Sequence, residues 1–109
     1  MKYNIKEFDR TNTDLIIDLI NYFIDIDSSI RIKVWDEMTG FDSFVSLDEL
    51  KKELFKQYCK FDEIYLVKAD KDLLEIIMHE DLCILDINEE QKKHIGSKFG
   101  QILIQFKEN

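Results

Sequence analysis

Apolar residues at helical spacing mark the first strong element along the chain. They recur at intervals of three and four residues, with acidic and amide side chains between them: Ile16, Leu19, Ile20, Phe23 and Ile24. Side-chain oxygens in residues 11–13 can cap the free N–H groups of a first helical turn. The pattern predicts an amphipathic helix after this cap, and the weak alternation over residues 2–8 indicates an edge strand before it.

An alternating segment follows at residues 30–35. Apolar and cationic side chains take turns there: Ile30, Arg31, Ile32, Lys33 and Val34. This alternation predicts a strand with one buried face, and it places Trp35 on the opposite, more polar face. Residues 36–45 are expected to form the longest loop.

A capping box locates the second helix. Ser46 is followed by Glu49, and Val45 and Leu50 hold the two hydrophobic-staple positions, so the helix is expected to begin at Leu47. Its expected buried stripe is Leu47, Leu50, Leu54 and Tyr58.

The middle of the chain predicts two further strands and one ambiguous segment. Residues 64–67 are almost continuously apolar, as in strands covered on both faces, and residues 82–87 predict another strand. Between them, Asp72 and Glu75 can cap a short helix that carries the apolar residues of 73–77. A hairpin with its turn at residues 79–81 fits the same pattern.

The last part of the chain predicts one more helix and one more strand. Asn88, with Gln91 three residues later, can begin the helix, which is expected to end near Gly96 or Gly100. Residues 102–106 then predict a final strand.

Helices that alternate with strands are typical of α/β domains. We therefore expect a single compact α/β domain over residues 1–109, with helices packed on a mostly parallel or mixed sheet of four to five strands. The alternative is an α+β fold with a hairpin at residues 73–87. With 109 residues, of which 45% are apolar, the chain can bury one core.

Composition restricts the partners and the cellular location. The formal net charge of −8 disfavours direct contact with nucleic acid or an anionic membrane surface and favours a basic protein partner. No apolar run approaches the about 20 residues that span a bilayer, and the N-terminal pattern is not that of a secretory signal. Cys59 and Cys83 match no metal or redox spacing, so we expect reduced thiols and a cytoplasmic location.

Three carboxylates are expected near the carboxyl ends of parallel strands, where such sheets bind ligands: Asp36, Asp70 and Asp86. If they converged, they could hold Mg²⁺ for phosphoryl transfer or hydrolysis. Acidic residues also favour turns, and no nucleotide-binding or nucleophile motif accompanies them. We therefore assign no catalytic residue, no metal ligand and no cofactor.

Aromatic and acidic side chains gather around the expected loop. A partly exposed tryptophan beside aromatic rings and carboxylates is typical of protein-binding hot spots. The candidate partner-binding residues are Trp35, Asp36, Glu37, Phe41, Asp42 and Phe44. The alternative interpretation is that a helix covers Trp35 while Phe41 and Phe44 close the core beneath the loop.

Three functional hypotheses follow. The leading one is a small acidic module that docks on a basic partner protein and inhibits or regulates it, as an immunity protein, an antitoxin or another inhibitor would. The first alternative is the small Mg²⁺-dependent enzyme described above. The second is a structural or regulatory homodimer that pairs through the sheet edge at residues 101–106.

Overall fold

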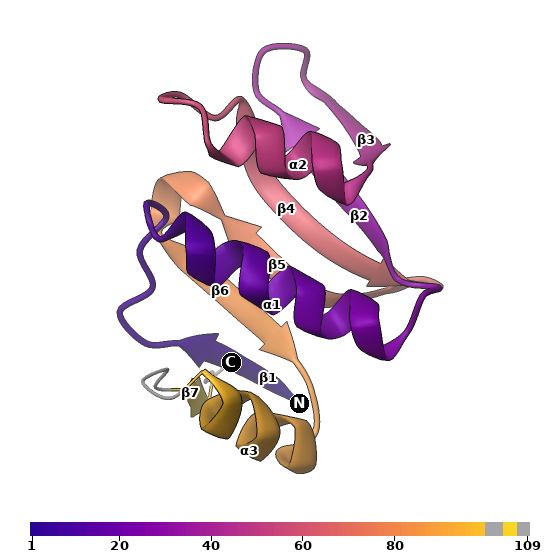
Figure 1. The fold of residues 1–109 in the computed structure, drawn as a ribbon, viewed down its shortest axis with the longest axis vertical. Coiled ribbons are helices and arrows are strands. Elements are labelled where there is room, and N and C mark those ends of the chain that lie inside the picture. Colours follow the sequence, from indigo (N-terminus) through magenta and orange to yellow (C-terminus); the bar gives the residue numbers. More distant parts are fainter. Residues whose placement is uncertain (100–103, 107–109) are drawn as a thin grey trace.

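The computed structural model describes residues 1–99 and 104–106, which form three helices and one sheet (Figure 1). The helices are α1 (Thr13–Ile26), α2 (Leu47–Leu54) and α3 (Glu89–Lys98), and a single 3-10 turn, η1, spans Met78–Glu80. The strands are β1 (Lys2–Ile5), β2 (Arg31–Asp36), β3 (Phe41–Val45), β4 (Phe61–Lys68), β5 (Lys71–Ile77), β6 (Leu82–Asp86) and β7 (Ile104–Phe106).

Every described strand runs antiparallel to its neighbours, in the order β3-β2-β4-β5-β6-β1-β7. Six strands form the body of this open sheet, and the three-residue β7 extends it beyond β1. The expected parallel or mixed α/β sheet of four to five strands is therefore wrong, and the fold is α+β. β1, expected at an edge, lies between β6 and β7.

The order of the strands explains this error. Each strand–helix–strand connection does join two strands that point the same way, as in a βαβ unit. An antiparallel strand always lies between the two, however: β2 separates β3 from β4, and β1 separates β6 from β7. The alternation of helices and strands in the sequence therefore arises without any parallel neighbours.

Residues 73–77 belong to β5, so the short helix expected there is wrong and the hairpin alternative is confirmed. The chain reverses through η1 and Asp81, which takes a left-handed φ of 48°, and β6 then pairs with β5 from Leu82 onward. Paired apolar residues such as Ile76-Ile77 suit a helix and a strand equally well in sequence. In the sheet they send one side chain to each face.

The helix starts are confirmed by their caps. Asn12 accepts a hydrogen bond from the Leu15 amide at 3.2 Å, and the Ser46 hydroxyl accepts one from the Glu49 amide at 3.1 Å. Asn88 begins α3 with a complete capping box. This helix ends at Lys98, between the two glycines near which its end was expected, and residues 100–103 lie outside the described residues.

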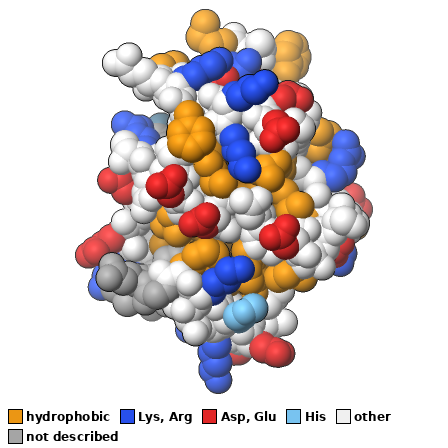
Figure 2. All heavy atoms as spheres, in the orientation of Figure 1, with side chains coloured by type: hydrophobic (Ala, Val, Ile, Leu, Met, Phe, Trp, Pro, Cys, Tyr) orange, Lys and Arg blue, Asp and Glu red, His pale blue; other side chains and the backbone are white. Residues whose placement is uncertain are grey.

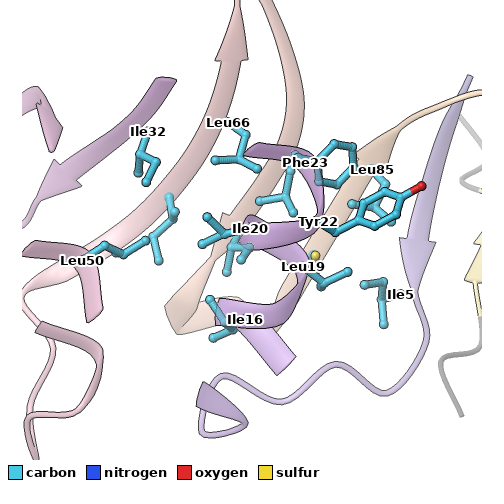
Figure 3. Close-up of a cluster of buried hydrophobic side chains, with 14 of the residues drawn as sticks. Ile5, Ile16, Leu19, Ile20, Tyr22, Phe23, Ile32, Leu50, Leu66 and Leu85 are labelled. Atoms are coloured by element: carbon cyan, nitrogen blue, oxygen red, sulfur yellow. The ribbon is translucent and has the colours of Figure 1, made fainter. Parts of the chain in front are cut away.

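One hydrophobic core lies between the helices and one face of the sheet. Figure 3 shows α1 side chains such as Leu19 and Ile20 in one buried cluster with Leu66 of β4 and Leu85 of β6. Leu50 of α2 belongs to the same buried cluster, and so does a residue of α3, Ile95. All three helices therefore pack on the same face. Tyr58, expected in the buried stripe of the second helix, lies beyond the end of α2 and is 70% exposed.

The face that carries the helices has charged side chains of both signs, with apolar side chains between them (Figure 2). Several acids of the protein are held by cations: Glu53 accepts a hydrogen bond from Lys56 at 2.8 Å, and Asp27 is paired with Lys68. Within the part of the chain that the structure describes, no helix is long and apolar enough to cross a membrane.

Candidate functional site

The second face of the sheet is covered by no helix of the described residues. Ile84 lies on this face: its neighbours Cys83 and Leu85 belong to the core cluster that the helices share with the sheet, whereas Ile84, although buried, lies outside that cluster. Other apolar side chains on this face are partly buried and do not belong to the residues packed against that cluster: Trp35, Tyr65, Val67, Ile77 and Leu82. We call this surface the uncovered face. The expectation that residues 64–67 are covered on both faces is therefore wrong.

Strand register arranges the uncovered face in rows of cross-strand neighbours, whose Cβ atoms lie about 4.5–5.5 Å apart. One row crosses five strands and consists of Asp42, Trp35, Glu63, Ile77 and Leu82. The next row consists of Phe44, Lys33, Tyr65, Glu75 and Ile84. The face thus mixes large apolar groups with carboxylates, as protein-binding surfaces do.

Residues 36–45 form a turn followed by β3, so the long loop expected there is wrong. Asp36 organises the turn, because its Oδ1 accepts a hydrogen bond from the Met38 amide at 2.8 Å and its carbonyl accepts one from the Gly40 amide at 2.8 Å. Gly40 has a φ of 70°, a left-handed conformation that glycine adopts without steric cost. The result is a hairpin of β2 and β3, hereafter the β2–β3 hairpin.

The structure brings half of the predicted partner-binding residues together on the uncovered face: Trp35, Asp42 and Phe44. Phe41 pairs with Asp36 beside the turn and is 72% exposed, whereas the Asp36 carboxylate is used within the turn itself. Glu37 lines a cleft next to the hairpin. Because Phe44 is also 49% exposed, the interpretation in which these phenylalanines close the core is wrong.

β3 is the last strand on its side of the sheet and pairs only with β2 among the described strands. Its outer row of backbone groups therefore has no strand partner. Four of its five residues are exposed, and neither proline nor lysine, which commonly block pairing at sheet edges, occurs in it.

Two aromatic rings of the uncovered face are covered by cations from β2. The Arg31 guanidinium carbon lies 3.6 Å from the centroid of the Phe44 ring, and Lys33 Nζ lies 4.9 Å from that of Tyr65. Tyr65 also donates a hydrogen bond to Glu63. Burial, this hydrogen bond and the surrounding carboxylates raise the pKa of Tyr65 well above its ordinary value, so the hydroxyl keeps its proton.

A second candidate site is a cleft of about 500 Å³ that Glu37 of the hairpin turn borders. Its walls come from the segment before α1, the segment between α2 and β4, and η1, and they include Arg10, Cys59 and His79. The His79 ring nitrogen Nδ1 lies 2.6 Å from Asp62 Oδ2. Sequence reasoning missed this pair, because no motif signals that residues 62 and 79 meet.

The cleft does not assemble an activated nucleophile. The Cys59 thiol contacts the Phe61 carbonyl at 3.6 Å, and no hydrogen bond joins it to His79 in the described residues. Burial raises the pKa of this thiol above its ordinary value, whereas a nucleophilic cysteine needs the opposite shift. Cys83 is fully buried within the core.

The three carboxylates of the magnesium hypothesis do not converge. Asp86 is paired with the N-terminal amine at 3.0 Å and with Lys71 at 3.7 Å, at the end of the sheet near Asp70. Asp36 lies at the opposite end, because it pairs with the first residue of β4 while Lys71 pairs with the last. Among the described residues, no group of three His, Cys, Asp or Glu side chains is placed to bind a metal ion.

Comparison of the chain with models of protein families, with curated proteins and with solved structures gives no significant match. The functional assignment therefore depends on the geometry of the uncovered face and of the β2–β3 hairpin.

Proposed function

We propose that the protein is a small acidic binding module that holds a basic partner protein on the β2–β3 hairpin and the adjoining uncovered face. The observation that carries this proposal is the free edge of β3, which presents Phe41 and Phe44 to solvent beside Trp35. A free edge can accept an extended segment of another protein by backbone hydrogen bonding, and neighbouring side chains then supply specificity.

The charge of the chain favours a basic protein over a second copy as the occupant of this edge. Each copy carries a formal charge of −8, so two copies repel one another. In an antiparallel pair of two β3 strands centred on Ser43, each Asp42 would face a Phe44 ring and gain no ion pair. A basic segment gains long-range attraction instead, which speeds association and weakens with added salt.

The role that follows from this surface is inhibition or regulation by occlusion. A bound partner has its own basic segment covered, as in complexes of immunity proteins, antitoxins and similar inhibitors. A polypeptide held in this way needs no chemical step. The function therefore requires only the surface residues on the hairpin and the rigid sheet behind them.

The test is selection from a displayed library of random peptides, with the whole protein as bait. We expect the selected sequences to alternate apolar with Lys or Arg residues and to lose binding when both exposed phenylalanines are replaced (Phe41→Ser with Phe44→Ser). A matched control pair on the helical face, Asp14→Asn with Asp18→Asn, should leave binding unchanged or slightly weaker. The proposal would be overturned if the unmodified protein enriched no sequence more strongly than the double phenylalanine variant does when it serves as bait. Enrichment of acidic sequences would also overturn it.

Light scattering separates this proposal from self-association. The module is expected to be a monomer at low salt. A stable dimer that Phe44→Ser dissociates would show that a second copy occupies the β3 edge and would contradict a basic partner.

A further inference from the structure

The strongest unassigned feature is the surroundings of Trp35 in the middle of the hairpin. Its cross-strand neighbour on β3 is Asp42, and its neighbour on β4 is Glu63. These three side chains lie in one row on the uncovered face, so the indole has a carboxylate on each side. Cross-strand spacing brings both carboxylates within reach of a group seated on the indole.

Neither carboxylate is neutralised by a cation of the described chain. Ion pairs involve other acids, and neither Asp42 nor Glu63 takes part in one. Glu63 accepts a hydrogen bond from the Tyr65 hydroxyl. This neutral donor leaves the negative charge of the Glu63 carboxylate in place. The two cations nearest to Trp35 in sequence, Arg31 and Lys33, are held over other rings. Lys60, the cation nearest to Glu63 in sequence, lies near Asp36 and over Phe61.

The three aromatic rings of this surface therefore differ in one respect. Phe44 and Tyr65 each have a cation of β2 over the ring, whereas no described cation lies over Trp35. Indole is the side chain whose face binds cations best. The ring with the strongest attraction for a cation, flanked by two unneutralised carboxylates, is thus the one left open.

We infer that Trp35, Asp42 and Glu63 form a site for a cationic side chain of the partner, an arginine guanidinium or a lysine ammonium. This inference depends on the proposed function, because it names the group through which the basic partner is recognised. The cation stacks on the indole and donates charge-assisted hydrogen bonds to the carboxylates on either side. Arginine fits better than lysine, since its planar fork can stack and donate at once.

Trp35 is the only tryptophan of the chain, so its fluorescence reports on the site directly. The probe is the tripeptide acetyl-Gly-Arg-Gly-amide, and its control is the same tripeptide with citrulline, which has nearly the same shape without the charge. At constant ionic strength, we expect a saturable change in Trp35 emission with the arginine peptide and at least fivefold weaker binding of the citrulline peptide. Raising the salt concentration tenfold should weaken arginine binding.

Single variants separate this site from general attraction to an acidic protein. Asp42→Asn and Glu63→Gln should each weaken arginine binding about two- to fivefold, the size typical of one exposed charge pair. Asp18→Asn on the exposed side of α1 removes the same charge far from Trp35 and should leave the binding unchanged. Equal binding of both tripeptides, or equal effects of all three variants, would overturn the inference.

The outcome is independent of the peptide selection described above. Selected peptides that need Arg or Lys to bind the hairpin, but bind Asp42→Asn and Glu63→Gln as well as the unmodified protein, would overturn the Trp35 site and leave the proposed function intact. Conversely, arginine binding at Trp35 with no selectable peptide would support the site and overturn the proposed function.

Discussion

Ile76 and Ile77 are consecutive residues of β5 that lie on opposite faces of the sheet. Ile76 belongs to the core beneath the helices, whereas Ile77 lies between Glu63 and Leu82 on the uncovered face. This pair shows how an antiparallel sheet with helices on one side keeps apolar side chains on both of its faces.

The same pair provides a direct test of the fold. Ile76→Ala should lower the free energy of unfolding by about 2–5 kcal/mol, because it leaves a cavity in the core. Ile77→Ala should cost about 1 kcal/mol or less, since its side chain has no helix above it. Urea denaturation of both variants measures the difference. Equal losses would mean that the second face is covered in solution.

The hairpin turn should depend on the Asp36 side chain. Asp36→Ala removes the acceptor for the Met38 amide and should destabilise the protein by about 1 kcal/mol. Glu37→Ala, at the next position, removes a carboxylate that makes no side-chain hydrogen bond in the described structure and serves as the matched control. Thermal unfolding that does not distinguish the two variants would contradict this role for Asp36.

Stability should depend on pH through Asp27. Hydrogen bonds from Lys68 and from Ser29 hold the pKa of this carboxyl well below its usual value. A group whose pKa is lowered by folding stabilises the protein above its unfolded pKa, about 3.9 for aspartate, and loses this effect as the pH falls toward the folded value. Asp27→Asn should therefore lower the melting temperature at pH 7, and the gap to the unmodified protein should narrow progressively as the pH falls below about 4.

The control for this prediction is Asp25→Asn. Asp25 lies in the last turn of α1, two residues before Asp27, is exposed and makes no ion pair with described residues. Its replacement should change the melting temperature little at any pH. A gap for Asp27→Asn that stays constant from pH 7 to pH 3 would show that the Lys68 pair does not lower the pKa of Asp27.

The two thiols should differ in reactivity. Burial raises the pKa of both Cys59 and Cys83, but only Cys83 is fully buried. A thiol reagent should therefore label Cys59 slowly in the native protein and reach Cys83 only after denaturation. Mass spectrometry counts the modified thiols. Rapid labelling of Cys59 would indicate a thiolate and would reopen the question of a nucleophile in the cleft.

Local signals in the sequence located the starts of the three observed helices because capping is a local interaction, although the same signal at Asp72 and Glu75 marked a helix where the structure has β5. Ser46 with Glu49 and Asn88 with Gln91 place their helix starts within a few residues of sequence. Strand order depends on contacts between distant segments, and the insertion of β2 between β3 and β4 leaves no local trace. The consecutive apolar residues of β5 were ambiguous because both faces of this strand are apolar. Consecutive apolar residues also occur in an amphipathic helix, so the pattern fits both.

The candidate site was predictable only in part. Alternation along β2 correctly placed Trp35 opposite Val34, because this depends on the pleat alone. The strand at Phe41–Val45 was missed, although Asp36 and Gly40 are a turn signal that could have located the hairpin. That Asp42 and Glu63 flank Trp35 could be recognised only from the register of β2, β3 and β4.

Amide hydrogen exchange of the protein with and without a selected basic peptide tests the binding account most directly. We expect slower exchange in β3 and β2 when the peptide is bound, with little change in α1 and α3, because the peptide occupies the free edge beside Trp35. Protection confined to the helices, or to the cleft around His79, would contradict the account.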